Sequence, residues 1–380
     1  MINLPQYAIN ALNRLKNSGY EAYVVGGCVR DAIMERESND IDITTSASCE
    51  EIEALFPHSI RTGGKFLTVT VLYGADSIEI TPFRKESGYT DLRRPDNIEK
   101  ASSLSDDIIR RDFTINSICF DGEKTIDLIG GIDDIQHRII RCIGNPDTRF
   151  REDALRILRA FRFSASLGFE IETNTMKAAL SNSHLLRNIS LERITEELSK
   201  ILLSPTPEAI YPLLKREAFG YIGISASSRI SIIKTLPKEL DIRLAAFLEL
   251  TGRDAHQYLP LPKKSKHFIS RVFSLLDSFP EMNKKAVKVS MNHFGEDAFS
   301  GAILLREAIY GGSKLYKDIL TEISSKNEPY KISDLAVNGS DILKLGIPPQ
   351  DIKKNLNKLL TEVIDSPELN RKETLIKLIK

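Results

Sequence analysis

Short runs of apolar and β-branched residues, separated by Gly, Asp and Asn, occupy roughly the first 140 positions of the chain. Residues 5–18 carry Ile9, Leu12 and Leu15 at near-helical spacing and predict an opening helix, and residues 49–56 predict a second one. The other runs are rich in Val, Ile or Thr and predict strands at 22–25, 41–45, 67–73, 78–83, 114–120 and 126–128. Strands interleaved with helices predict a mixed α/β unit.

From about Arg149 to Lys380 the strand signals fade and helical periodicity takes over. Prolines such as Pro205 and Pro237 separate the helical segments. No segment of roughly 20–50 residues repeats, which argues against a regular solenoid. The predicted helices are 149–167, 190–203, 207–217, 241–250, 264–278, 297–310, 313–325, 340–345, 348–364 and 370–379. The pattern predicts an α+β fold, in which an α/β head precedes a long all-α extension.

Composition narrows the class of protein. The chain has 380 residues, 42% hydrophobic and 27% charged, which is ordinary for a soluble globular protein of two or more compact units. No apolar run approaches the length of a membrane span, and residues 1–12 do not resemble a signal peptide. The four cysteines form no CxxC pair, which predicts buried, reduced thiols. We expect a cytoplasmic protein with no membrane partner and no obligate protein partner.

The charge balance does not exclude an RNA partner. The formal net charge is zero, from 52 basic and 52 acidic residues, but RNA binding depends on local basic patches. Three lysine-rich clusters in the helical part could contact phosphates, although each could also be an ordinary solvated helix face. They contain Lys263, Lys264, Lys266 and His267, then Lys284, Lys285 and Lys288, then Lys353, Lys354 and Lys358.

The segment 26–42 carries the strongest chemical signal. A predicted strand leads into Gly26 and Gly27, and a helix is expected to start near Cys28. Two glycines let the backbone approach a phosphate closely, and a helix N-terminus offers unpaired N–H groups. Arg30 adds a positive charge nearby. This arrangement predicts a phosphate site.

Asp40 and Asp42 are two positions apart at the start of a predicted strand. Residues with this spacing in a strand point to the same face. Mg²⁺ prefers such oxygen ligands and completes its shell with substrate phosphates and water. Glu79, on another predicted strand, is the candidate for a third acid. A lone pair of this kind is often a solvated turn, but after the glycine pair it predicts two-metal phosphoryl transfer.

Two arginine-rich segments follow. Arg110 and Arg111 precede a predicted strand and could hold a triphosphate, although adjacent arginines are most often solvated. On the predicted helix 149–167, Arg156, Arg159 and Arg162 recur every three residues. This spacing places them along one side of the helix, with a gradual rotation around its axis. Asp153 lies about one turn before Arg156 on nearly the same face, so a structural ion pair is the alternative interpretation.

Such an Asp–Arg pair could select bases without a template. Cytosine and adenine both present an exocyclic amino group beside a ring-nitrogen acceptor. A carboxylate accepts a hydrogen bond from the amino group, and a guanidinium donates one to the ring nitrogen. Uracil and guanine carry a carbonyl oxygen in place of that amino group. Asp153 and Arg156 therefore predict that CTP and ATP are admitted and that UTP and GTP are rejected.

Together these segments resemble the class II tRNA nucleotidyltransferases, the bacterial and eukaryotic CCA-adding enzymes of the polymerase β superfamily. Segment 26–42 resembles the family's metal-binding motif, 110–116 its ribose and triphosphate motif, and 127–131 its head-to-neck hinge. Segment 152–162 resembles the base-reading motif and 189–194 the neck motif that supports it. Residues 335–341 look like the C-terminal segment of short bacterial members.

The resemblance implies an organisation and a set of roles. It implies a nucleotidyltransferase head at residues 1–141, a helical neck at 142–204, a body at 205–329 and a tail at 330–380. CMP and AMP would be transferred from CTP and ATP to the 3′ end of tRNA, with the acceptor and TΨC region bound along the helical part. The implied metal ligands are Asp40 and Asp42 with Mg²⁺, with Glu79 as a further catalytic acid; the implied nucleotide ligands are Gly26, Gly27, Arg30, Arg111, Asp153, Arg156, Arg159 and Arg162.

Two further features refine what the resemblance implies. Segment 86–95 resembles the loop that relatives need to add the final A, which favours A addition. A metal-phosphohydrolase domain, which some longer relatives carry, would require a His-Asp dipeptide, and the sequence contains none. Three alternatives stay open: an A-adding enzyme that works with a CC-adding partner, a poly(A) polymerase, and an RNA-binding protein with an inactive head. The neutral composition and short length count against the second, and the intact Asp40 and Asp42 against the third.

Overall fold

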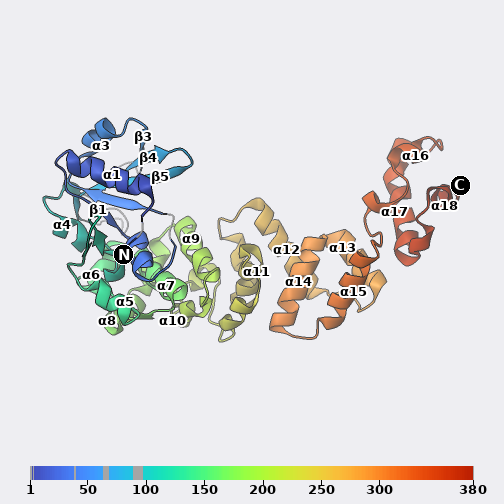
Figure 1. The fold of residues 1–380 in the computed structure, drawn as a ribbon. Helices are drawn as coiled ribbons and strands as arrows, with labels where there is room; N and C mark the ends of the chain where they lie inside the picture. The colour runs from blue at the N-terminus through green and yellow to red at the C-terminus, as the bar shows by residue number, and fades with distance from the viewer. Residues whose placement is uncertain (1, 3, 38–39, 63–67, 89–96, 380) are drawn as a thin grey trace. The chain divides into compact units, whose positions relative to one another are not determined.

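The computed structural model describes the chain except residues 1, 3, 38–39, 63–67, 89–96 and 380. It divides into two compact units, 1–226 and 227–380, which Figure 1 shows in blue to yellow-green and in yellow to red. The first unit holds the sheet and the second is helical throughout the part that the structure describes. The predicted α+β fold is therefore confirmed.

A seven-stranded sheet forms the centre of the first unit, in the order β3-β4-β5-β2-β1-β8-β9 (Figure 1). β2 and β5 pair in parallel and the other neighbours are antiparallel. The strands are β1 (Ala22–Val25), β2 (Asp42–Thr45), β3 (Ser59–Thr62), β4 (Thr68–Tyr73), β5 (Asp76–Pro82), β8 (Cys119–Phe120) and β9 (Thr125–Ile126). A separate hairpin of β6 (Arg84–Ser87) and β7 (Asn97–Lys100) follows β5.

The two faces of the sheet carry different side chains because neighbouring residues of a strand point to opposite sides. On one face, Ile43 and Ile80 join a large apolar core with α1 (Gln6–Asn17) and α3 (Cys49–Leu55). On the other face, Val25 packs in a smaller cluster with Leu104 and Ile108 of α4 (Leu104–Ile109). Asp42 lies opposite Val25 in the register, so it is on this second face.

Helices complete the first unit. α2 (Gly27–Ile33) starts at the glycine pair, and α5 (Gly131–Gln136) packs on the 3₁₀ turn η2 (Thr114–Asn116). Next come α6 (Pro146–Glu152), α7 (Leu155–Leu167), α8 (Thr173–Ser181), α9 (Leu191–Leu202) and α10 (Tyr211–Lys215), with a short parallel pair of β10 (Ile139–Ile140) and β11 (Glu170–Ile171). α7 packs along α9. All four cysteines belong to this unit, and each is free and buried, as predicted.

The second unit is built from α11 (Leu240–Thr251), α12 (Lys263–Asp277), α13 (Lys284–Phe294), α14 (Glu296–Ile309), α15 (Lys314–Ser325), α16 (Gly339–Leu343), α17 (Pro349–Asp365) and α18 (Lys372–Ile379). A cluster that includes Val337, Ile342, Leu360 and Val363 forms the core of its last part. Among the described helices, none is long and apolar enough to cross a membrane.

Two predicted elements are wrong in detail. The expected strand 114–120 begins as the 3₁₀ turn η2, and only Cys119–Phe120 pair in the sheet. The expected helix 149–167 breaks between α6 and α7, because Asp153 has an extended backbone with φ −139°. Several short elements, including β3, β6, β7, α4, α5 and α8, were not predicted, and neither was α13.

Candidate active site

The glycine pair brings the backbone close to β2, the strand that begins with Asp42. Gly26 has φ +92°, in the region that L side chains rarely adopt, and an added Cβ would lie 3.3 Å from Asp42 Oδ2. A side chain at this position would therefore be strained and would crowd the carboxylate. The chain then turns directly into α2, whose first residue is Gly27. The helix start expected near Cys28 is confirmed to within one residue, and the phosphate site at the glycine pair stays a prediction.

The carboxylates of the predicted metal site share one region of the sheet. Asp42 and Glu79 are direct partners across the parallel β2–β5 pair. Exposed Asp40 lies two residues before Asp42, and the carbonyl of Ile41 between them accepts a hydrogen bond from Glu79 N–H at 3.2 Å. Burial, together with the charges of Asp40 and Glu79, raises the pKa of Asp42 to about 6, and the Arg111 charge opposes this rise. Crowded negative charge of this kind would be relieved by a cation, so the donor set fits a metal ion.

The part of the chain that the structure describes contains no group of three or more His, Cys, Asp or Glu side chains arranged to hold a metal ion. Asp42 is half-buried, whereas Asp40 and Glu79 are both exposed, so the three acids form an open group rather than a closed cage. An open site suits Mg²⁺, which usually keeps water and substrate phosphates in its shell. The roles of these three acids remain predictions.

Arg110 and Arg111 are held by a residue that the sequence reasoning missed. Asp107 is fully buried on α4, and its Oδ1 accepts from Arg110 Nε at 2.8 Å while its Oδ2 accepts from Arg111 Nη2 at 3.0 Å. Burial by itself would raise the pKa of Asp107, but the two guanidiniums overcome burial and lower it. Arg149 of α6 fixes the same pair through its guanidinium, which donates to the carbonyls of Arg110 and Arg111. The two arginines are thus ordered rather than solvated.

Arg30, Arg159 and Arg162 gather around the ring of Phe163, with guanidinium carbons 5.5, 5.4 and 4.1 Å from its centroid. Burial and then the neighbouring Arg159 charge lower the pKa of Arg162. Three cations around one buried ring favour an anionic or π-rich partner beside them. Phe163 was not predicted as a site residue, because its spacing is that of an ordinary core position.

Each of these arginines also has a carboxylate or amide partner. Arg30 Nη1 donates to Asn116 Oδ1 at 2.6 Å, and Arg162 pairs with Glu197 of α9 at 2.9 Å. Arg159 pairs with Asp112 at 2.6 Å. Burial would raise the pKa of Asp112, but the Arg159 charge and hydrogen bond lower it to about 2. The predicted triphosphate and base-reading segments are therefore joined directly.

Asp153 and Arg156, the predicted base readers, are each held by a different neighbour. Asp153 accepts from Arg193 Nη2 of α9 at 3.1 Å and from Leu155 N at 3.0 Å. Arg156 donates to Glu152 at 2.7 Å and to Arg149 O at 3.0 Å. Because the helix breaks at Asp153, the two side chains do not lie one turn apart on a continuous helix face. That part of the prediction is wrong, although both residues belong to the same turn region.

Segment 127–131, which resembles the family's head-to-neck hinge, forms a tight turn before α5. Both oxygens of Asp127 are used by backbone N–H groups of the following residues, from Ile129 to Ile132, at 2.8–3.2 Å. A Cβ on Gly131 would lie 2.4 Å from Thr114 O, so only glycine fits there. The turn therefore locks α5 against η2.

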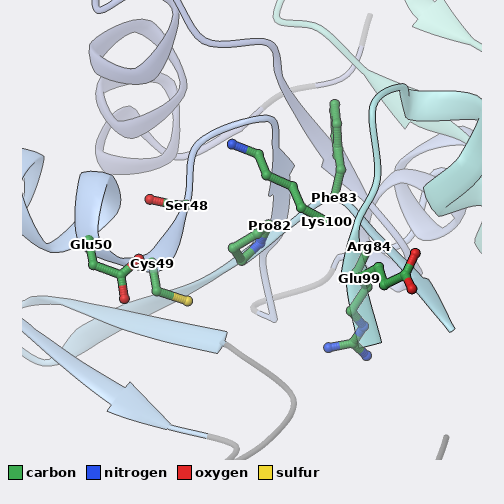
Figure 2. A pocket seen from close by; sticks show the side chains of 8 residues that line it. All are labelled: Ser48, Cys49, Glu50, Pro82, Phe83, Arg84, Glu99 and Lys100. Carbon is green, nitrogen blue, oxygen red and sulfur yellow. The ribbon is translucent and has the colours of Figure 1, made fainter. Parts of the chain in front are cut away.

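Most of the predicted A-addition loop, residues 89–95, lies outside the described residues, whereas β6 and β7 on either side of it are described. A cavity of about 100 Å³ opens at the base of this hairpin, beside the start of α3 (Figure 2). Pro82 on its wall pairs with Thr45, three residues along β2 from Asp42, or roughly 10 Å. The cavity is therefore separate from the carboxylates. Its lining is Ser48, Cys49, Glu50, Pro82, Phe83, Arg84, Glu99 and Lys100.

The lysine clusters of the second unit differ from one another. Lys288 is fully buried and pairs with Glu328 at 2.5 Å, while Lys284 and Lys285 pair with carboxylates of their own. This cluster is therefore not the phosphate-binding patch that the sequence allowed. Lys263 and Lys264 are exposed in the first turn of α12, and that turn contains no acidic residue.

Comparisons with known proteins identify the family of the chain. Residues 22–141 match the family model described as the poly A polymerase head domain, and residues 168–218 match the one described as the probable RNA and SrmB-binding site of polymerase A. The CCA-adding enzymes of Lactobacillus helveticus and Bacillus licheniformis are 34% and 36% identical to this chain, covering 98% and 97% of it and 96% of each relative.

A solved structure is similar as well. The crystal structure of the Bacillus stearothermophilus CCA-adding enzyme in complex with CTP superposes with a TM-score of 0.82 at 30% identity, covering 98% of this chain and 96% of that one. Relatives above 30% identity that match nearly end to end fix the family. The chain belongs to the family of CCA-adding enzymes, the tRNA nucleotidyltransferases.

Proposed function

We propose that this protein completes the 3′ end of tRNA by adding C, C and A in turn, transferring CMP from CTP and AMP from ATP and releasing pyrophosphate. The observation that carries the proposal is the crowding of Asp42, Asp40 and Glu79 beside Arg111 at a glycine turn, reflected in the raised pKa of Asp42. Carboxylates so placed gain most from binding a metal ion that carries phosphates. A tRNA substrate implies a cytoplasmic reaction.

Asp40 and Asp42 would hold Mg²⁺, with Glu79 as the neighbouring acid. When bound, the metal supplies a polarised 3′-hydroxyl and charge neutralisation at the leaving pyrophosphate. Gly26 and Gly27 leave room for phosphate oxygens to approach the backbone. Arg111 and Arg30 have fixed orientations and would contact phosphate and ribose oxygens.

Base selection would fall to Asp153 and Arg156. The Asp153 carboxylate accepts from the amino group that cytosine and adenine share, and Arg156 donates to the adjacent ring nitrogen. Arg193 and Glu152, their partners in the structure, orient the two groups before a base arrives. Arg159 and Arg162, with Phe163, would form the rest of the pocket wall.

The assignment of parts follows the same proposal: head 1–141, neck 142–204, and body and tail along 205–380 that bind the acceptor and TΨC region of tRNA. The relatives that cover both chains nearly end to end are named CCA-adding enzymes, which favours the full product over A-only addition and over poly(A) synthesis. An inactive head would gain nothing from a carboxylate at Asp42, whose charged form is disfavoured by burial and by the neighbouring acids Asp40 and Glu79.

With Mg²⁺, the protein is expected to extend tRNA that lacks its CCA end using CTP and ATP, and to leave GTP and UTP unused. The products are separated by length on a denaturing gel, starting from tRNA without CCA and from tRNA ending in CC. Extension of only the second substrate would select the A-adding alternative, and a long A tail would select a poly(A) polymerase. Equal use of all four nucleotides would contradict the base-pocket assignment.

The exposed start of α12 is expected to contribute to tRNA binding. Changing Lys263 and Lys264 together to Glu should weaken binding about tenfold at low salt, with less effect at high salt, because the contacts are to phosphates. Filter binding across a salt series measures this. Lys314 and Lys317, exposed in the first turn of α15, provide a matched control pair. An equal loss in that control would show that the effect is one of overall charge.

A further inference from the structure

Asp107 connects three separate parts of the head. Besides Arg110 and Arg111, it accepts from Thr44 Oγ1 of β2 at 3.1 Å and from Arg84 N, at the start of β6, at 3.4 Å. Thr44 lies two residues beyond Asp42 on the same strand and is fully buried. A single carboxylate without solvent exposure therefore contacts the metal-bearing strand, the arginine pair and the base of the hairpin.

The position of Arg111 depends on this contact. Arg111 Nη2 and Thr44 Oγ1 both donate to Asp107 Oδ2, and Thr44 points to the same face of β2 as Asp42, two residues away, so the shared oxygen holds the guanidinium beside the strand that carries Asp42. A guanidinium close to several carboxylates would form an ion pair with the nearest of them unless another anion already holds it. Asp107 supplies that anion from the protein interior, through the contact of its Oδ2 with Arg111 Nη2 at 3.0 Å.

We propose that Asp107 is a positioning residue for the incoming nucleotide: it holds the Arg111 guanidinium in register with the strand that carries Asp42, using Thr44 as the second anchor. The inference rests on the proposed function, since it names the nucleotide triphosphate as the ligand of Arg111. Asp107 itself touches no substrate. Its effect is to fix the orientation of Arg111 before the triphosphate binds, which lowers the entropic cost of binding.

Asp107→Asn tests the proposal because it keeps the size and the acceptor for Thr44 but removes the charge that restrains Arg111. We expect the KM for both CTP and ATP to rise about tenfold while kcat changes by less than about threefold, the pattern of lost binding rather than lost chemistry. The dissociation constant of CTP, measured by calorimetry without tRNA, should rise by the same factor. Thr44→Val, which removes only the second anchor, should produce a smaller rise.

Asp134→Asn is the matched control. Asp134 is also a buried carboxylate of the first unit, accepting from Thr114 Oγ1 at 2.6 Å and from Arg141 at 3.0–3.1 Å. Its loss should lower the unfolding temperature to a similar extent as Asp107→Asn and leave the KM for nucleotides unchanged. If both variants raise KM equally, Asp107 acts only through stability and the proposal is wrong.

A double-mutant cycle with Arg111→Ala provides a second test that does not depend on stability. If Asp107 acts through Arg111, adding Asp107→Asn to Arg111→Ala should raise KM by less than about twofold further. Independent, multiplying effects would overturn the inference. Failure of the wild-type protein to add C or A to tRNA would instead refute the proposed function, and CTP affinity would then still report whether Asp107 positions Arg111.

Discussion

Asp42→Ala is expected to abolish nucleotide addition while leaving tRNA affinity near that of the wild type. Asp42 lies on the second face of the sheet, against Gly26 and across from Glu79, and burial with the neighbouring acidic charges raises its pKa to about 6. Removing a metal ligand should cost several kcal/mol of transition-state stabilisation, at least about a thousandfold in rate. Single-turnover extension and filter binding to tRNA measure the two quantities separately.

The tRNA measurement decides what a loss of activity means. A variant that neither extends nor binds tRNA has lost its fold, and circular dichroism would reveal this. Asp76→Ala removes an exposed acid from the start of the same β5 strand that carries Glu79, and should extend tRNA at the wild-type rate. Turnover by Asp42→Ala above about one tenth of the wild-type rate would remove the metal assignment.

Asp153→Ala is expected to reduce discrimination between CTP and UTP by about ten- to a hundredfold, because one base-specific hydrogen-bonded contact contributes about 1–3 kcal/mol of selectivity. Uracil carries a carbonyl oxygen where cytosine carries an amino group, and the alanine no longer repels it. The measurement is the ratio of kcat/KM for the two nucleotides on tRNA that lacks CCA. The kcat/KM for CTP should fall as well, since a contact to its amino group is lost.

The structure adds a complication to this variant, because Arg193 loses its partner when Asp153 is removed. Asp147→Ala is the matched control: Asp147 belongs to α6, just before Asp153, and accepts from Arg151 at 2.9 Å and from Asn182 at 2.7 Å. That variant should keep the wild-type preference for CTP. Unchanged discrimination in Asp153→Ala would show that base reading lies elsewhere in the turn.

The alternation of side chains along short strands allowed much of the head to be predicted. Ile43 and Ile80 point to the core and Asp42 and Glu79 to the opposite face because a strand has a period of two residues. The break at Asp153 could not be predicted, since Asp and Ala are compatible with a helix. There the contact with Arg193, forty positions away in the chain, overrides local preference.

The candidate site shows the same division between local and distant contacts. Asp107 precedes Arg111 by four residues, a spacing at which helical side chains meet, so this pair was within reach of the sequence. Its contact with Thr44, sixty-three positions apart, was not. The gathering of Arg30, Arg159 and Arg162 around Phe163 likewise depends on how α2 and α7 pack, which periodicity does not specify.

The buried cysteines of the first unit allow its opening to be measured by thiol labelling. Burial raises the pKa of Cys28 to about 11 and those of Cys119 and Cys142 to about 12, so these thiols are un-ionised at neutral pH and unreactive while the unit is closed. The second unit has no cysteine, because all four lie before residue 143. The rate at which a thiol reagent labels Cys28, Cys119 and Cys142 in the full-length protein therefore follows opening of the catalytic unit alone, whereas Cys49 lines the cavity beside α3 and is counted separately.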